Sequence, residues 1–108
     1  MSKTVSELVS ELGLEPIALV RGEREVKGGF TGDLLSYVMA HLQADEVWVT
    51  IMTNVNVVAV ASLTDAACVV VADGAEIAAE VVQSAHQRGV NLLRSGMSAF
   101  ELCAKLGL

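Results

Sequence analysis

Basic residues are scarce in this 108-residue sequence, where seven Lys and Arg stand against thirteen Asp and Glu for a formal net charge of −6. That charge has the wrong sign for a protein that grips a nucleic-acid backbone. Long hydrophobic runs are also missing, because residues such as Asn54 and Asp65 interrupt the longest one before the roughly 18 residues of a membrane span. Residues 1–4 lack the apolar segment of a signal peptide. We therefore expect a cytoplasmic protein with neither nucleic acid nor a membrane as a partner.

Cysteine and proline are almost absent. Cys68 and Cys103 form neither a Cys-x-x-Cys pair nor a disulfide framework, and their apolar surroundings predict two reduced core residues. Proline occurs once, and 53 % of the residues are hydrophobic, which excludes a disordered chain. The length is typical of one domain, so we expect a single α/β domain over residues 1–108.

Sequence signatures of catalysis are missing as well. The glycine-rich stretch 28–33 (GGFTGD) matches neither GxxxxGK(S/T) nor GxGxxG, which excludes a P-loop kinase or ATPase. His41 and His86 fall at the polar edges of separate predicted helices, without a second ligand at metal-binding spacing. No serine lies in GxSxG, and no histidine is placed by sequence to activate Cys68. We predict a non-catalytic protein without a metal or cofactor.

Two alternating periodicities predict the secondary structure. Apolar residues at helical spacing predict helices over residues 5–12, 32–43, 54–64, 73–87 and from 98 to about 106. Short apolar runs predict strands over 16–20, 47–52, 67–72 and 90–93, with a short edge strand near Val26 in an otherwise loop-like stretch 21–30. Strands that alternate with helices predict a layered α/β domain in which helices flank a mostly parallel central sheet.

Capping residues set the expected helix starts. Thr4 with Glu7 matches the capping box, in which a hydroxyl and a carboxylate satisfy each other's backbone donors, and Ser98 with Glu101 matches it again. Thr31 is predicted to cap the second helix, with Asp33 in its first turn. The fourth helix is expected to begin at the D-x-x-E pair of residues 73 and 76.

Residues 54–64 allow two interpretations. The valines of this segment favour a strand, and Thr53 with Asn54 can form the turn of a hairpin. Equally, either residue can cap a short buried helix. The alternation of strands and helices on both sides favours the helix, which we adopt.

Ligands of open parallel sheets bind beyond the carboxyl ends of the strands. Four segments follow predicted strands and carry polar or small residues: 21–22, 53–56, 73–74 and 94–98. Backbone N–H groups at helix starts bind anions, so we predict a small anionic ligand there. The candidate ligand-binding residues are Thr53, Asn54, Asn56, Asp73, Gly74, Arg94 and Ser95. Helix capping is the competing interpretation for Asp73 and Ser98, and structural hydrogen bonding for Thr53, Asn54 and Asn56.

Four mostly apolar segments carry a family resemblance: 32–40 (GDLLSYVMA), 47–50 (VWVT), 56–61 (NVVAVA) and 97–101 (MSAFE). From about Val26 to its end, the chain resembles DRTGG-domain proteins, and more narrowly their small stand-alone members, which are similar to the N-terminal domain of HPr kinase and are often labelled serine kinases. At the positions of the namesake Asp-Arg and Thr-Gly-Gly, this sequence has Thr53-Asn54 and Ala72-Asp73-Gly74.

The resemblance implies a regulatory, ligand-sensing domain of the kind fused to CBS modules and phosphotransacetylases. Our first hypothesis is such a domain, non-catalytic and homodimeric, with a small anionic or nucleotide ligand. The alternative is an accessory subunit that binds a protein partner and no small ligand, since the stand-alone relatives accompany hydrogenase or redox-complex genes. The apolar stretch around Phe100 and Leu106, or the face near Trp48, is the expected interface.

Overall fold

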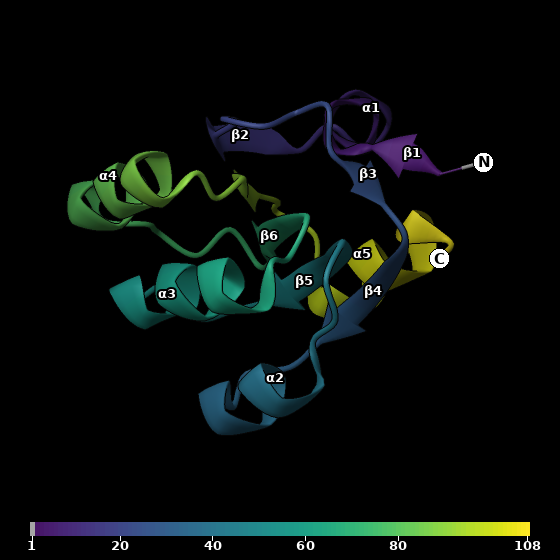
Figure 1. The fold of residues 1–108 in the computed structure, drawn as a ribbon. Helices are drawn as coiled ribbons and strands as arrows, with labels where there is room; N and C mark the ends of the chain where they lie inside the picture. The colour runs from purple at the N-terminus through teal and green to yellow at the C-terminus, as the bar shows by residue number, and fades with distance from the viewer. Residues whose placement is uncertain (1) are drawn as a thin grey trace.

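The computed structural model describes residues 2–108 and arranges them as a sheet between two layers of helices (Figure 1). The strands are β1 (Lys3–Thr4), β2 (Glu15–Ala18), β3 (Glu25–Val26), β4 (Gly28–Thr31), β5 (Glu46–Thr50), β6 (Cys68–Val71) and β7 (Leu92–Arg94). The helices are α1 (Val5–Leu12), α2 (Leu35–His41), α3 (Val55–Thr64), α4 (Ala79–Arg88) and α5 (Ala99–Leu106).

The main sheet has five strands in the order β2-β7-β6-β5-β4. β4, β5, β6 and β7 are parallel to their neighbours, whereas β2 joins the edge antiparallel to β7. β1 and β3 form a separate two-stranded antiparallel ribbon. The predicted fold class, an α/β domain with a mostly parallel central sheet flanked by helices, is confirmed.

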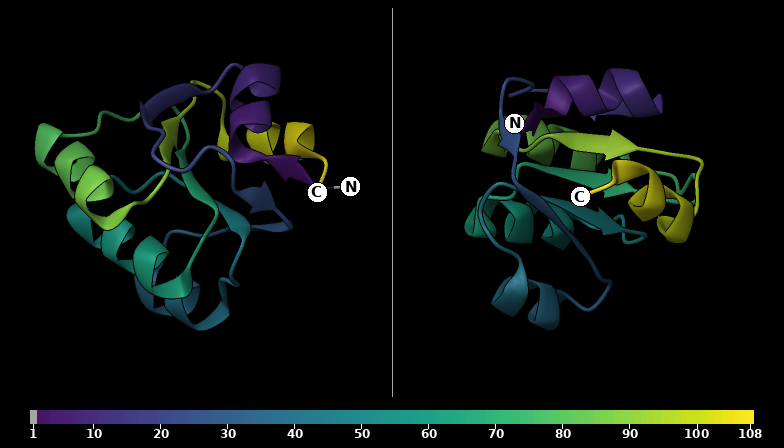
Figure 2. Two further views of the ribbon diagram at one scale, coloured as in Figure 1. Left: turned by 45° about the horizontal axis from the view of Figure 1, so that its top comes forward. Right: turned by 90° about the vertical axis from the view of Figure 1, so that its right-hand side faces the viewer.

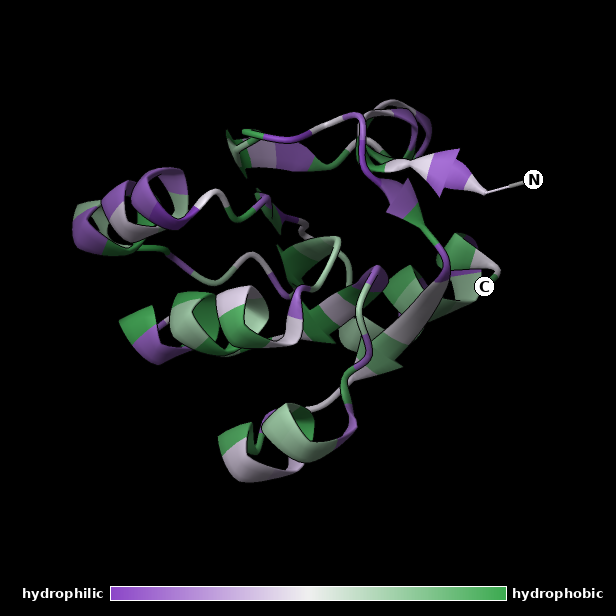
Figure 3. Cartoon of the chain, viewed as in Figure 1, coloured by the Kyte–Doolittle hydropathy of each residue, from purple (hydrophilic) through white to green (hydrophobic). Residues whose placement is uncertain are grey.

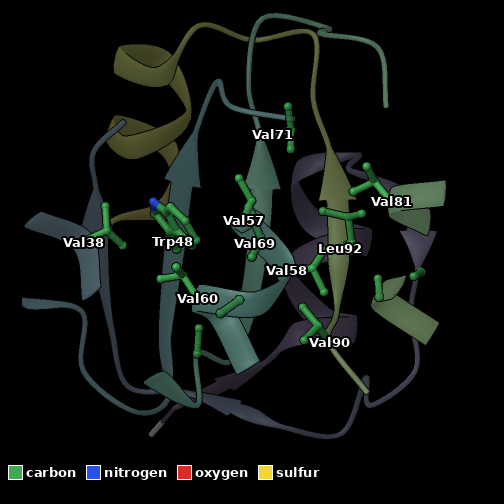
Figure 4. Close-up of a cluster of buried hydrophobic side chains, with 14 of the residues drawn as sticks. Val38, Trp48, Val57, Val58, Val60, Val69, Val71, Val81, Val90 and Leu92 are labelled. Atoms are coloured by element: carbon green, nitrogen blue, oxygen red, sulfur yellow. The ribbon is translucent and has the colours of Figure 1, made fainter. Parts of the chain in front are cut away.

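Helices cover both faces of the sheet (Figure 2). On one face, α2, α3 and α4 pack their valines against Trp48, Val69 and Leu92 (Figure 4). On the other face, α1 and α5 bury Leu8 and Leu102. Figure 3 shows hydrophobic residues concentrated in the central strands, whereas α4 carries many hydrophilic ones. Strands buried on both sides explain the uninterrupted apolar runs of β5 and β6.

Three helix predictions are confirmed by their caps. Thr4 and Ser98 each form a complete capping box with the glutamate three residues later, at α1 and α5. Residues 55–64 form the helix α3, so the hairpin alternative is wrong. Asn54 caps this helix by accepting a hydrogen bond from Asn56 N. Valine has a low helix propensity. Most valines of α3 are nevertheless buried against the sheet and α4, and this packing stabilises the helix.

The stretch 28–34 differs from its prediction. Gly28–Thr31 is the parallel edge strand β4 and not a loop, with Gly29 opposite Val47 and Thr31 opposite Val49. Thr31 is therefore part of a strand and does not cap a helix. α2 begins only at Leu35, without a side-chain cap, so Asp33 precedes the helix. Gly28 and Gly29 have a low strand propensity, so the pairing with β5 stabilises this strand.

The start of α4 was also predicted wrongly. α4 begins at Ala79, and Asp73 lies in a turn with φ +60°. The N–H groups of Asp73 and Gly74 donate to Met97 O and Ser95 O, both at 2.8 Å. These bonds hold the residues in the loop after β6, so the D-x-x-E pair caps nothing.

The two cysteines differ in their surroundings. Cys68 is fully buried in β6, and its burial raises the pKa of its thiol to about 12. Cys103 is exposed on α5, so its prediction as a core residue is wrong. Trp48 is completely buried and is therefore not itself available to a partner, whereas Phe100 is 85 % exposed.

Candidate functional site

The carboxyl ends of β5, β6 and β7 lie side by side at one edge of the sheet. Each strand is followed there by candidate ligand-binding residues. Thr53, Asn54 and Asn56 follow β5, Asp73 and Gly74 follow β6, and Arg94 and Ser95 end β7. All seven predicted residues are thus brought to the same edge.

Hydrogen bonds join the loops that follow β6 and β7. Besides the two bonds from Asp73 and Gly74, Ser95 N donates to Val71 O at 2.9 Å. The buried Ser95 hydroxyl accepts a bond from Met97 N at 3.1 Å. Asp73 and Gly74 remain exposed above this network. The two loops form one hydrogen-bonded platform with Ser95 as a structural support and Asp73 and Gly74 at its surface.

Arg94 supplies the positive charge at this edge. Its Nε donates to Glu15 Oε1 at 3.1 Å, and its Nη1 donates to Ala75 O at 3.4 Å. The Arg94 side chain as a whole is 30 % exposed. These bonds hold the guanidinium beside Ala75 in the loop after β6 and Glu15 at the start of β2.

The loop after β5 is joined to the same edge by a bond from Ala72 N to Thr50 O at 2.9 Å. Asn54 and Asn56 are exposed, and Thr53 is half-buried. The Asn54 side chain is engaged as the helix cap, with its Oδ1 2.9 Å from Asn56 N. The structural interpretation of Asn54 is therefore confirmed.

The segment 21–22 does not belong to this edge. β2 runs antiparallel to β7, so its carboxyl end lies at the opposite side of the sheet. There the N–H groups of Val20 and Arg21 donate to Oδ1 of the buried Asn91, at 3.0 and 2.8 Å. The inclusion of Arg21 and Gly22 among the strand-end segments was wrong, because the sequence does not reveal the direction of an edge strand.

Asp33 is a residue of this edge that the sequence analysis missed. Its Oδ1 accepts bonds from Thr50 Oγ1 at 2.7 Å and from Ile51 N at 3.0 Å, at the carboxyl end of β5. It follows β4, the strand that was predicted as a loop. If residues 28–31 are recognised as a strand, the strand-end rule predicts Asp33 at this edge.

Two cavities lie away from the seven predicted residues. One, of about 160 Å³, lies between α5 and the strands β4 and β5. The other, of about 550 Å³, is lined by all three lysines of the sequence, Lys3, Lys27 and Lys105. Lys3 forms an ion pair with Glu11. In a chain of net charge −6, this lysine-lined cavity is a second place where an anion can be held.

Within residues 2–108, no three His, Cys, Asp or Glu side chains are grouped so that they could hold a metal ion. None of the helices in this part combines the length and the apolar character that crossing a membrane requires.

Comparison with known proteins gives a likeness in fold. No family model matches the chain, and no curated protein matches it. It is similar to a crystal structure of the CBS and DRTGG domains of the regulatory region of Clostridium perfringens pyrophosphatase, complexed with the activator diadenosine tetraphosphate. The TM-score is 0.75 at 9 % identity, and the match covers 94 % of this chain and 44 % of that one. The chain therefore spans less than half of that regulatory region, and it has a DRTGG-like fold.

Proposed function

We propose that this chain is a non-catalytic regulatory domain that senses a small anionic ligand, such as a nucleotide, at the carboxyl ends of β5, β6 and β7. The proposal rests on one observation above all: three neighbouring parallel strands end in polar loops at one edge, and the guanidinium of Arg94 contacts the loop after β6. This is the location where open parallel sheets bind their ligands.

The ligand class has two supports. Arg94 and the start of α3 favour a negatively charged group. The similar structure is that of a regulatory region complexed with a nucleotide activator, which supports regulation and a nucleotide as the corresponding roles here. A likeness to the N-terminal domain of HPr kinase and a homodimeric state remain part of the proposal.

A thermal-shift experiment tests this function. The protein is heated with ATP, ADP, AMP, diadenosine tetraphosphate or inorganic phosphate. A ligand at 100 times its Kd adds about 2.7 kcal/mol to the free energy of unfolding. We expect the nucleotide shift to disappear in Arg94→Ala. It should persist in Arg21→Ala, the matched control, because Arg21 is an exposed arginine at the opposite edge.

Two results would contradict the proposal. If Lys27→Ala or Lys105→Ala abolishes the shift while Arg94→Ala keeps it, the anion binds in the lysine-lined cavity. If none of the compounds raises the melting temperature of the parent protein, the sensor function is wrong.

A second function is favoured by a different observation. Phe100 is 85 % exposed, and a large exposed aromatic side chain is typical of an interaction surface. An accessory subunit that binds a protein partner, such as a component of a redox or hydrogenase complex, would use this surface without any small ligand. A flat thermal-shift screen together with self-association or partner binding would support it.

A further inference from the structure

The cavity of about 550 Å³ gathers the lysines of this acidic chain. It lies between the β1–β3 ribbon, the start of β4 and the carboxyl end of α5, which share one side of the molecule (Figure 1). Among residues 2–108, all three lysines line this cavity, and none of the thirteen acidic residues does. Val26, Leu106 and Leu108 form its apolar part. The lining therefore has the opposite sign to the chain as a whole.

Two of the three lysines have no counter-ion. Lys3 forms an ion pair with Glu11. Within residues 2–108, neither Lys27 nor Lys105 has a carboxylate at ion-pair distance. All three lysines are exposed, so their charges are accessible to a ligand.

The carboxylates closest in the fold to Lys27 bind other groups. Lys27 N donates to Asp45 O at 2.8 Å, but the Asp45 carboxylate accepts its bond from Arg24 Nη2, at 2.7 Å. Glu46 lies beside the first residue of β4, and its Oε1 accepts a bond from Gln43 N at 2.7 Å. The hydrogen bonds of the fold thus hold these two carboxylates away from Lys27.

The charge balance of the lining favours an anion. Three ammonium groups at one cavity repel one another, and a bound anion removes this repulsion. The carboxyl end of α5 contributes only about half a negative charge. Even with a carboxylate at Leu108, the lining stays positive. Lys105 also stabilises the end of its helix, but Lys27 lies between two strands, where it has no such role.

Size and chemistry indicate the class of ligand. Sites for small molecules have volumes of roughly 300–1,000 Å³, and this cavity falls within that range. A lysine ammonium group acts as a point charge and is a common partner of phosphate. Several such groups suit a ligand that carries several negative charges close together.

We propose that the lysine-lined cavity is a second anion site, which binds an oligophosphate through Lys3, Lys27 and Lys105. This inference goes beyond the proposed function, because the two sites lie at opposite sides of the sheet. β4 is parallel to β5, so the start of β4 lies away from the carboxyl ends where Arg94 is found.

Isothermal titration calorimetry with inorganic tripolyphosphate gives the first test. We expect the parent protein to bind it, and Lys27→Ala and Lys105→Ala each to weaken the binding about fivefold. Both residues are exposed, so both variants should fold. Arg88→Ala is the matched control, because it removes one exposed cation at the end of α4, outside the cavity. A parent protein that does not bind tripolyphosphate, or an equal loss in Arg88→Ala, would overturn the inference.

Inorganic phosphate at the same ionic strength tests the ligand class. A single phosphate cannot meet three separated lysines, so it should bind about tenfold more weakly than tripolyphosphate. Equal affinities of the two anions would overturn the assignment of an oligophosphate.

Glu11→Gln tests Lys3 through a gain of affinity. The substitution releases Lys3 from its ion pair, so the variant should bind tripolyphosphate severalfold more tightly than the parent protein. Glu80→Gln makes the same change of net charge on α4, on the other side of the molecule (Figure 1), and should bind as the parent does. A gain of this kind cannot result from impaired folding. Equal affinities of the two variants would contradict a site that includes Lys3.

Nuclear magnetic resonance locates the bound anion. Gly28 and Gly107 line the cavity, so tripolyphosphate should shift their amide signals. The amide signal of Gly74, in the loop after β6, should stay in place. Shifts confined to Gly74 would place the anion at the other site and overturn the inference.

AMP and tripolyphosphate together separate the two proposals. AMP carries a base and one phosphate, whereas tripolyphosphate carries no base. If Arg94→Ala loses the AMP shift and still binds tripolyphosphate, both sites stand. If AMP gives no shift but the lysine variants lose tripolyphosphate, the cavity stands and the sensor function is wrong. If Arg94→Ala loses both ligands and the lysine variants keep both, the sensor function stands and the second site is wrong.

Discussion

At the scale of single residues, Asn91 and Arg24 join parts of the chain that are distant in sequence. Asn91 is buried at the start of β7 and uses both ends of its amide. Its Oδ1 accepts from Val20 N and Arg21 N, and its Nδ2 donates to Arg21 O and Ala67 O. Asn91 therefore connects the turn after β2 to the segment that precedes β6, the central strand of the sheet.

Replacing Asn91 by alanine should cost stability rather than ligand binding. The substitution removes one buried hydrogen bond, to Ala67 O, and three partly buried ones with the backbone of Val20 and Arg21. The expected loss is roughly 2–4 kcal/mol of unfolding free energy. Urea denaturation measures it. Asn56→Ala is the matched control, because Asn56 is exposed, and it should change stability by less than about 0.5 kcal/mol. Equal losses in the two variants would contradict this role of Asn91.

Arg24 connects β3 with the turns before β5 and β6. Its Nη2 donates to Asp45 Oδ1 at 2.7 Å, and its Nη1 donates to Asp65 Oδ1 and Ala66 O, each at 3.0 Å. The hydrogen bond from Arg24 holds the pKa of Asp45 below its usual value. The bonds from the backbone and hydroxyl of Thr4 likewise lower the pKa of Glu7.

These shifts predict the pH dependence of stability. A carboxyl group with a lowered pKa in the folded state stabilises the protein above its unfolded pKa, and the contribution is lost as the pH falls through the folded value. We expect stability to decline below about pH 5. Asparagine tolerates the φ of +67° at position 45. Asp45→Asn should therefore fold, but it should be less stable than the parent protein at neutral pH and lose less stability on acidification. Parallel denaturation curves of the two proteins between pH 7 and pH 3 would contradict this.

At the scale of elements, α3 combines a structural cap with a place in the candidate site. Asn54 accepts the bond from Asn56 N that begins this helix. In the proposed function, the amide nitrogen is the part of this side chain that remains for a ligand. The two roles therefore reside in different atoms of the same residue and can be separated by substitution.

Asn54→Asp and Asn54→Ala separate them. Asn54→Asp keeps the capping oxygen, so its stability should match that of the parent protein, but its new negative charge should weaken the binding of an anion. Asn54→Ala should lose about 1 kcal/mol of stability with the cap. Denaturation and thermal shift with nucleotide are measured on both. An unchanged nucleotide shift in Asn54→Asp would show that the ligand does not reach α3.

At the scale of the whole molecule, the two faces of the sheet are covered unequally. α2, α3 and α4 lie on one face, and only α1 and α5 lie on the other, where the cavity next to β4 remains. The polar strand ends lie at one edge, whereas the exposed Phe100 lies on the outer side of the second face. The proposed ligand-binding edge and the exposed Phe100 thus lie on different surfaces of the same fold.

Dimerisation should make the unfolding transition depend on protein concentration. Subunit association stabilises the folded state by mass action, so the urea midpoint of the parent protein should rise as its concentration increases. If the exposed Phe100 forms the interface, the midpoint of Phe100→Glu should not move. Tryptophan fluorescence of the buried Trp48 reports both transitions. A concentration-independent midpoint in the parent protein would contradict the proposed homodimer.

Local sequence signals are sufficient to predict several elements of this fold. The capping boxes at Thr4 and Ser98, the glycine ends of α1 and α4, and the apolar runs of β5 and β6 are each encoded within a few residues. The alternation of these elements also predicted the layered fold and the strand-end location of the seven candidate residues. These inferences succeeded because capping, periodicity and parallel-strand geometry follow rules that do not depend on distant partners.

Other features depend on contacts between segments that are distant in the sequence. β4 is a strand because β5 pairs with it, and this pairing brings Asp33 to the candidate site. The antiparallel direction of β2 removed Arg21 from that site, and the bonds of Asp73 to the loop after β7 kept it out of α4. Packing of α5 buried Leu102 and left Phe100 and Cys103 exposed. Each of these features results from hydrogen bonds or packing between distant segments, and local sequence patterns do not reveal such contacts.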